Sequence, residues 1–213
     1  MQIAPPPKMD QFEDWAEDQF QVLSTGGGLV VTPPRRDKRG WDFIVEWDEG
    51  AVPDVPRDLQ NVARTARIQL KSSRQRRPEA RIKLSNALRF AEQSDPCFIV
   101  VYWLDRPRSC VEIYARHFDE ELIERSLKRA REASRDGRAD YHKIEITTSM
   151  DDVHLRTADL VPWIKQVCFE PTNVYADRKA AIFKSVGYSV ENPAKAFSIP
   201  VGNVERVIEH AMG

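Results

Sequence analysis

Hydrophobic and polar residues alternate with two different periods in the first third of the chain. Over residues 9–23, apolar side chains recur every three or four positions with acidic residues between them, which predicts an amphipathic helix ended by the glycines at 26–28. Strict alternation then predicts strands at residues 41–47 and 64–72, after a short strand at residues 29–32. We expect the two longer strands to pair antiparallel.

The middle and the end of the chain contain further elements. Residues 97–104 are eight consecutive apolar residues, which is typical of a strand covered on both faces. Asp119 is a favourable N-cap for a helix that extends to Arg135. The remaining pattern predicts a basic loop at 74–80, helices at 81–93, 160–167, 178–186 and 204–211, and strands at 110–116 and 143–148.

The order of these elements predicts an α/β protein. A helix is followed by three strands, a second helix and a strand, and then by strand, helix and strand. Such an order builds a mixed central sheet flanked by helices. We expect residues 1–150 to form the core and residues 151–213 to form a C-terminal helical extension or subdomain.

Composition narrows the classes of function. The 213 residues carry a net charge of −1, so any site for a polyanion must be a local patch. The longest apolar run has eight residues, far short of the roughly 20 that span a bilayer, and the acidic N-terminus lacks the apolar segment of a secretory signal. The three cysteines form no Cys-x-x-Cys pair, which argues against a structural zinc site. We therefore expect a cytoplasmic protein without a membrane partner.

Polar side chains occupy one face of the two longer predicted strands. Asp42 begins the first strand, and Gln69 and Lys71 lie two positions apart on the second, so that their side chains share a face. Carboxylate and amide oxygens are ligands that Mg²⁺ or Mn²⁺ prefers, and the backbone carbonyl of Leu70 adds a further neutral oxygen. A metal held there polarises a phosphate, while Lys71 can orient the attacking water and stabilise charge on the phosphoryl oxygens.

These residues also resemble a known family. The segment GWDFIVEW at residues 40–47, followed about 20 residues later by IQLKSS at residues 68–73, resembles the PD-(D/E)XK nuclease superfamily. It is most similar to the branch with a D…QxK pattern, which includes Mrr-type restriction endonucleases and related bacterial anti-phage defence nucleases. The resemblance covers about residues 9–105 and implies a restriction-endonuclease-like core.

The resemblance implies an activity and a set of site residues. It implies Mg²⁺- or Mn²⁺-dependent hydrolysis of double-stranded DNA in bacterial restriction or anti-phage defence. It also implies a homodimer or higher oligomer, activated by a sensor domain or a partner protein. A glutamate of the first helix would complete the metal site, and Glu17 matches better than Glu13. The implied catalytic residues are Asp42, Gln69, Lys71 and Glu17, and the implied metal ligands are Asp42, Glu17, Gln69 and Leu70.

Basic residues gather close to the predicted site in a chain that is nearly neutral. Residues 61–90 contain nine lysines and arginines and one acid, and a further cluster directly precedes Asp42. Phosphate contacts of this kind supply affinity without sequence preference. We expect the nucleic acid to contact the side chains of Arg35, Arg36, Lys38, Arg39, Arg74, Arg76 and Arg77.

Two other functions are open on the same fold. Gln69 stands where the usual pattern of the superfamily has an acid, which lowers the charge of the metal site by one. A catalytically inactive module that binds nucleic acid or serves in assembly is therefore the alternative to a nuclease. A protein-interaction domain that waits for its activator is a third interpretation.

Overall fold

The structure is a computed structural model, and it describes residue 3 and residues 8–34, 40–48, 63–107, 109–170 and 172–186. The described residues form five α-helices and seven strands, so the expected α/β class is confirmed. None of the helices in this described part of the chain is long and apolar enough to cross a membrane.

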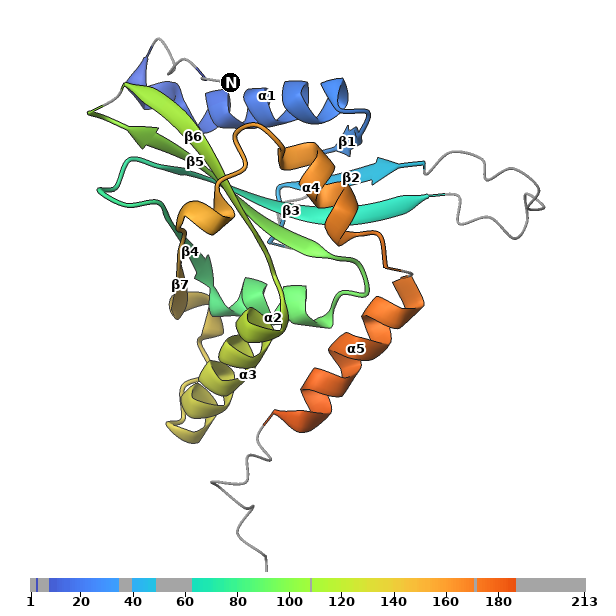
Figure 1. Ribbon diagram of the computed structural model, residues 1–213. Helices are drawn as coiled ribbons and strands as arrows, with labels where there is room; N and C mark the ends of the chain where they lie inside the picture. Colours follow the sequence, from blue (N-terminus) through green and yellow to red (C-terminus); the bar gives the residue numbers. More distant parts are fainter. Residues whose placement is uncertain are drawn as a thin grey trace, which may run out of the picture.

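Five strands form a mixed central sheet (Figure 1). Its order is β1 (Val30–Thr32), β2 (Phe43–Trp47), β3 (Arg64–Ser73), β5 (Cys97–Asp105) and β6 (Cys110–His117). β3 and β5 run parallel, whereas all other neighbours in this sheet are antiparallel. The predicted antiparallel pairing of the strands that we now label β2 and β3 is confirmed.

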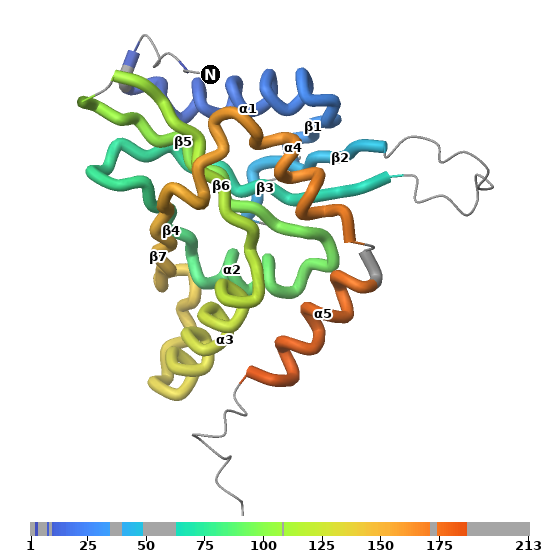
Figure 2. The backbone as a smooth tube through the Cα atoms, viewed as in Figure 1, coloured from blue at the N-terminus to red at the C-terminus, as the bar shows by residue number. Residues whose placement is uncertain are grey.

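Helices cover both faces of the sheet, as the ribbon and the backbone tube show from the same side (Figures 1 and 2). α1 (Phe12–Gly26) and α4 (Leu160–Val167) pack on one face. α2 (Leu84–Glu92), α3 (Glu120–Arg135) and α5 (Thr172–Ser185) pack on the other. β5 is apolar without interruption because it supplies both cores: Phe98, Val100 and Tyr102 face the first, and Cys97, Ile99 and Val101 face the second.

The glycines that end α1 have a second role in packing. α1 buries Phe12, Ala16 and Phe20 against the sheet, in agreement with the predicted amphipathic helix. Gly27 follows the helix, and a Cβ at this position would lie 2.7 Å from the Val161 side chain of α4. The absence of a side chain at residue 27 therefore lets α4 approach the end of α1.

The structure corrects the prediction of a basic loop at residues 74–80 and a helix at residues 81–93. Glu79–Lys83 forms β4, which pairs antiparallel with β7 (Glu145–Ser149) in a separate two-stranded sheet. α2 begins only at Leu84. Buried Ala80 and Ile82 fit a strand, but the buried residues of α2 continue the same stretch at helical spacing. The sequence-distant partner β7 decides between the two patterns.

The C-terminal part contributes to the same core as the beginning of the chain. α4 has the predicted bounds and places Leu160, Val161 and Ile164 in the core that α1 covers. α5 begins at Thr172, before the predicted start at residue 178. The predicted helix at residues 204–211 lies outside the described residues, and the division at residue 150 stays a prediction.

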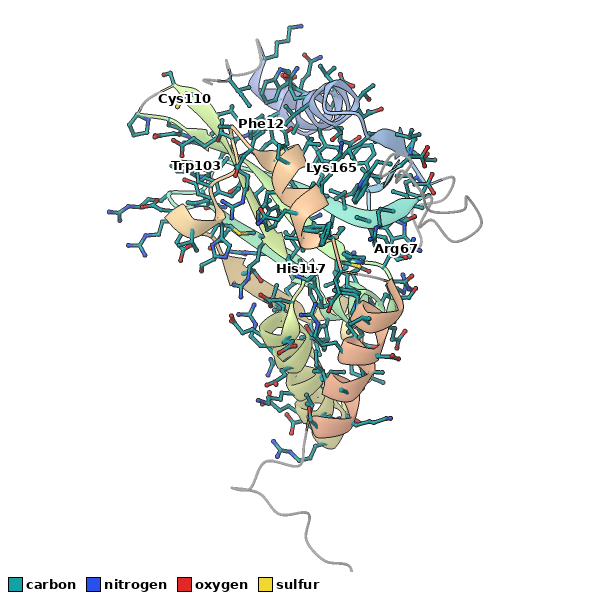
Figure 3. All side chains as sticks on the ribbon, turned by 45° about the vertical axis from the view of Figure 1, so that its right-hand side comes forward. Phe12, Arg67, Trp103, Cys110, His117 and Lys165 are labelled. Carbon is teal, nitrogen blue, oxygen red and sulfur yellow. The ribbon has the colours of Figure 1, made fainter. Side chains whose placement is uncertain are left out.

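Buried polar groups attach α5 to the sheet and to α2. The His117 ring nitrogen Nε2 shares a hydrogen bond of 2.8 Å with the Tyr175 hydroxyl, and Figure 3 shows His117 at the end of β6. The Lys179 ammonium donates to the Phe90 and Gln93 carbonyls at 2.8 Å and 2.7 Å. Burial, together with the cations of Lys179 and Arg178, lowers the pKa of His117 to about 3. The imidazole is therefore neutral in the folded protein at neutral pH.

This neutral histidine predicts a loss of stability in mild acid. The unfolded chain takes up a proton at His117 near pH 6.5, and the folded protein does so only near pH 3. The contribution of this residue to stability is therefore complete above pH 6.5 and decreases progressively as the pH falls from 6.5 to about 3. The unfolding free energy of the wild type should decrease between pH 7 and pH 5. In His117→Gln we expect this decrease to be smaller by about 2 kcal/mol. Urea unfolding at both values measures it, and equal decreases in variant and wild type would contradict the assignment.

Candidate functional site

A polar cleft of about 550 Å³ lies where β2 and β3 part. β3 pairs with β2 only as far as Ile68, opposite Phe43, and then continues to Ser73. Residues from α1, β4, α2 and the segment that leads into β7 line the other sides of the cleft. Gln69 and Lys71 of β3 thus line a polar recess next to the start of β2.

Asp42 is held at the start of β2 by two contacts with β3. Its backbone N–H donates to the Ile68 carbonyl at 2.8 Å, and its Oδ2 accepts a hydrogen bond from the Leu70 N–H at 2.7 Å. The preceding Trp41 is buried, and the Arg67 guanidinium carbon lies 4.3 Å from its ring centroid. The carboxylate is therefore fixed against the part of β3 that lines the cleft.

The backbone of Leu70 faces the same opening. In a strand, the N–H and the C=O of one residue point to the same side, and the Leu70 N–H points at Asp42. The Leu70 carbonyl therefore faces the side on which β2 has ended, while the Leu70 side chain packs in the core beneath α1. This direction suits the carbonyl ligand that the sequence predicts.

Gln69 and Lys71 lie on the opposite face of β3 from Ile68 and Leu70, and both line the cleft. The Gln69 side chain is only 4% exposed, and its Oε1 has no hydrogen-bond partner among the described residues. Burial of an unpaired amide oxygen is unfavourable by roughly 1–3 kcal/mol. The hydroxyl of Tyr102 also lacks a partner, but it does not line the cleft. Gln69 thus lines the cleft and carries a buried acceptor that has no partner among the described residues.

Glu17 and Glu13 reach the cleft from α1. Burial raises the pKa of Glu17, and the negative charges of Asp42, Glu13, Asp14 and Asp18 raise it further. The Glu17 and Asp42 carboxylates therefore repel one another across the cleft. A cation bound between them would relieve this repulsion.

The residues around Asp42 suit a hard divalent cation. Two carboxylates, an unpaired amide oxygen and a backbone carbonyl supply oxygen ligands of the kind that Mg²⁺ and Mn²⁺ prefer. The structure thus brings the four predicted catalytic residues, Asp42, Gln69, Lys71 and Glu17, to one cleft.

The residues that we expected to contact nucleic acid do not line the cleft or lie outside the described residues. Arg74, Arg76 and Arg77 are exposed in the turn between β3 and β4, and none of them lines the cleft. The Arg74 guanidinium carbon lies 5.6 Å from the ring centroid of Phe12. The other predicted cluster (Arg35, Arg36, Lys38 and Arg39) lies outside the described residues.

Several residues line the cleft that the sequence pattern did not single out. Arg81 and Lys83 come from β4, and Ser85, Asn86 and Arg89 come from α2. Their basic members belong to the charge excess over residues 61–90, which was the available signal. His142 and Glu145 also line the cleft, but only the pairing of β4 with β7 brings them there.

A second cluster of metal-ligating types lies elsewhere in the described part of the chain. Ligand atoms of Asp105, Cys110 and Glu112 all lie within 4.8 Å of one another near the β5–β6 turn, where Figure 3 shows Cys110. Glu112 accepts a hydrogen bond from the Tyr114 hydroxyl at 2.8 Å. The Asp105 and Glu112 side chains of this cluster therefore already have partners within the protein.

Comparison with known proteins does not assign the chain to a family. No family model matches the sequence, and no curated protein matches it.

Gly40 determines the path of the chain just before Asp42. Its φ is +85°, and a Cβ there would lie 2.4 Å from the Asn86 side chain of α2. Gly137 offers a matched control, because its φ is +70° and a Cβ there would meet nothing within 4 Å.

We expect Gly40→Ala to destabilise the protein more than Gly137→Ala does. Both variants carry backbone strain of about 1–2 kcal/mol, and only Gly40→Ala adds overpacking of about 1–3 kcal/mol. Adding Asn86→Ala should remove the second contribution alone. Chemical denaturation of the wild type and these three variants measures this, and equal destabilisation at residues 40 and 137 would contradict the close approach.

Proposed function

We propose that the protein is a metal-dependent endonuclease with a restriction-endonuclease-like core of the PD-(D/E)XK type. The chain order α1, antiparallel β1–β3, α2 and then β5 parallel to β3 supports this fold. The observation that carries the function is that Asp42, Gln69, Lys71 and Glu17 line one cleft, and that the buried Oε1 of Gln69 has no partner among the described residues.

Four groups would hold the metal: the carboxylates of Asp42 and Glu17, the amide oxygen of Gln69 and the carbonyl of Leu70. A bound Mg²⁺ or Mn²⁺ supplies Lewis-acid polarisation of the phosphate and lowers the pKa of a water. The protein holds the Asp42 carboxylate in place through the Leu70 N–H, so that little reorganisation accompanies binding.

Lys71 acts directly on the reacting groups. It lies two residues after Gln69 on the same face of β3 and lines the same cleft. Its ammonium donates a hydrogen bond that orients the attacking water, and its charge stabilises the phosphoryl oxygens as negative charge develops on them. Asp42 and Lys71 thus have separate roles, one in binding the metal and one in positioning the water.

The proposed substrate is double-stranded DNA. Basic side chains from β3, β4 and α2 stand around a site whose other side is acidic, which suits a polyanion together with a cation. The resemblance supports a role in bacterial restriction or anti-phage defence, in the cytoplasm. It also supports a homodimer or higher oligomer that is activated by a sensor domain or partner protein.

The second candidate is an inactive module on the same fold that binds nucleic acid or serves in assembly. Gln69 favours it, because an amide carries one negative charge fewer than the acid of the usual pattern. An inactive module would bind DNA without cutting it, whereas a protein-interaction domain would do neither.

We expect the wild-type chain to relax and linearise supercoiled plasmid in Mg²⁺ or Mn²⁺. Asp42→Asn and Lys71→Gln should each reduce the rate about 100-fold or more, because they remove a metal ligand and a transition-state contact. Glu46→Gln is a matched control, since Glu46 is exposed on β2 and lies outside the cleft. Gel assays with all four proteins measure the rates.

Metal binding separates the two interpretations independently of cutting. Mn²⁺ titration followed by electron paramagnetic resonance should show weaker binding for Asp42→Asn and unchanged binding for Glu46→Gln. Plasmid that stays uncut in every divalent metal, although the wild type binds DNA, would establish the inactive module instead.

The exposed turn between β3 and β4 gives a further prediction. Charge reversal of Arg74, Arg76 and Arg77 to Glu should weaken binding of a DNA duplex and flatten its dependence on salt, because three phosphate contacts are lost. Fluorescence anisotropy between 50 and about 200 mM salt measures both quantities. Unchanged binding would remove this turn from the DNA interface.

A further inference from the structure

A thiol and two carboxylates meet beside the β5–β6 turn, away from the cleft around Asp42. Asp105 is the last residue of β5 and lies directly opposite Cys110, the first residue of β6 (Figure 3). Glu112 follows two positions after Cys110, so the two side chains share a face of β6. Opposite residues of an antiparallel pair have Cβ atoms about 5 Å apart, and a long side chain reaches its diagonal neighbour. Strand pairing thus brings the three groups together, and none of them lines the cleft.

The geometry of the three groups fits a single metal ion. One ligand atom from each of Asp105, Cys110 and Glu112 lies within 4.8 Å of the other two. Ligands held about 2.0–2.3 Å from a tetrahedral Zn²⁺ are roughly 3.5 Å apart, so a movement of about 1 Å would close the site. Asp105 and Cys110 are buried and Glu112 is half-buried, which distinguishes this cluster from acids that merely share an exposed surface.

The Cys110 thiol is an independent indication of a ligand. This residue is only 5% exposed, and its sulfur has no partner among the described residues. The other two cysteines are also buried, but Cys97 donates to two backbone carbonyls and Cys168 also has a partner. A free cysteine often packs as a small apolar residue, whereas the neighbours of this thiol are two carboxylates. A metal ion bound to the sulfur would explain both its burial and its surroundings.

The existing contacts of the two carboxylates are compatible with an ion. The Tyr114 hydroxyl donates to Glu112 at 2.8 Å, and Asp105 also has a partner. A carboxylate has two oxygens with about four lone-pair positions, so one hydrogen bond does not prevent ligation. Carboxylates that bind metals usually accept such a hydrogen bond, which holds them in the required orientation. The contact between Tyr114 and Glu112 is of this kind.

We propose that Asp105, Cys110 and Glu112 bind Zn²⁺, with Cys110 as a thiolate. A thiolate with two carboxylates suits this borderline-soft ion, whereas Mg²⁺ prefers oxygen ligands alone, as in the site proposed around Asp42. The thiol releases its proton to solvent when the ion binds. Three protein ligands leave the fourth tetrahedral position to water, and the ion joins the ends of β5 and β6. This inference goes beyond the proposed nuclease function and does not depend on it.

Cobalt substitution tests the thiolate ligand directly. Co²⁺ occupies tetrahedral zinc sites, and a bond between cobalt and a thiolate produces a charge-transfer band in the near ultraviolet. We expect the metal-free, reduced wild-type protein to develop this band when Co²⁺ is added and to lose it when Zn²⁺ displaces the cobalt. Cys110→Ser should abolish the band. Asp42→Asn, in the separate cleft, should retain it.

The affinity for Zn²⁺ separates the ligands from their hydrogen-bond partner. Loss of an outer partner lowers metal affinity roughly 10–100-fold, so we expect about a tenfold loss in Tyr114→Phe and about 100-fold or more in Cys110→Ser and Asp105→Asn. Competition with a chromophoric chelator measures these values. Glu46→Gln is the control, because Glu46 is exposed on β2. Circular dichroism of the metal-free variants, all close in shape to the wild type, confirms that they fold.

Three results would overturn the zinc site: no charge-transfer band in the wild type, a band that persists in Cys110→Ser, or equal Zn²⁺ affinity of wild type and Asp105→Asn. Cobalt that binds without the band is held by other side chains and also counts against the site. The plasmid assay is read separately. A protein that cuts DNA but lacks the band keeps the proposed function and loses the zinc site, and a band in a protein that cuts nothing does the reverse.

Discussion

The hydrogen bond between the Leu70 N–H and the Asp42 carboxylate joins the two strands at the point where their backbone pairing ends. A hydrogen bond to an ionised group is stronger than one between neutral groups, so it fixes the side chain as well as the turn that carries it. β3 can hold this position because it is buried on both faces and paired along its other edge with β5. The position of Asp42 in the cleft therefore depends on this one hydrogen bond to β3.

The cleft is lined by both acidic and basic side chains, and this gives it its chemical character. The chain carries a net charge of only −1, and long-range attraction of DNA is therefore weak. Electrostatic fields inside the cleft take the place of this long-range attraction. Repulsion between Glu17 and the neighbouring acids raises the pKa of Glu17 and favours a cation, while the cations of β3, β4 and α2 favour phosphate. The proposed metal-bound nucleic acid would match both sides at once.

Buried polar groups on the two sides of the sheet have different functions. Beside α5, the His117 ring pairs with the Tyr175 hydroxyl, and the Lys179 ammonium pairs with two carbonyls of the chain around α2. These contacts are complete within the protein, so they attach a helix and need no ligand. Gln69 is also buried and lines the cleft, but its oxygen has no partner among the described residues. This difference separates a structural polar contact from a candidate binding group.

The local periodicity of the sequence determined most of the elements and the faces of β2 and β3. Alternation from Asp42 to Trp47 and around Gln69 placed the polar side chains correctly, because the side-chain period of a strand is fixed by its backbone. The tertiary structure alone decided that residues 79–83 form β4 and that His142 and Glu145 join the cleft, because both depend on pairing with the distant β7. It also decided that Ser85 and Asn86 at the start of α2 line the same cleft as the carboxylates. Contacts between residues far apart in the chain produce no periodic pattern in the local sequence, so these features become visible only in the folded structure.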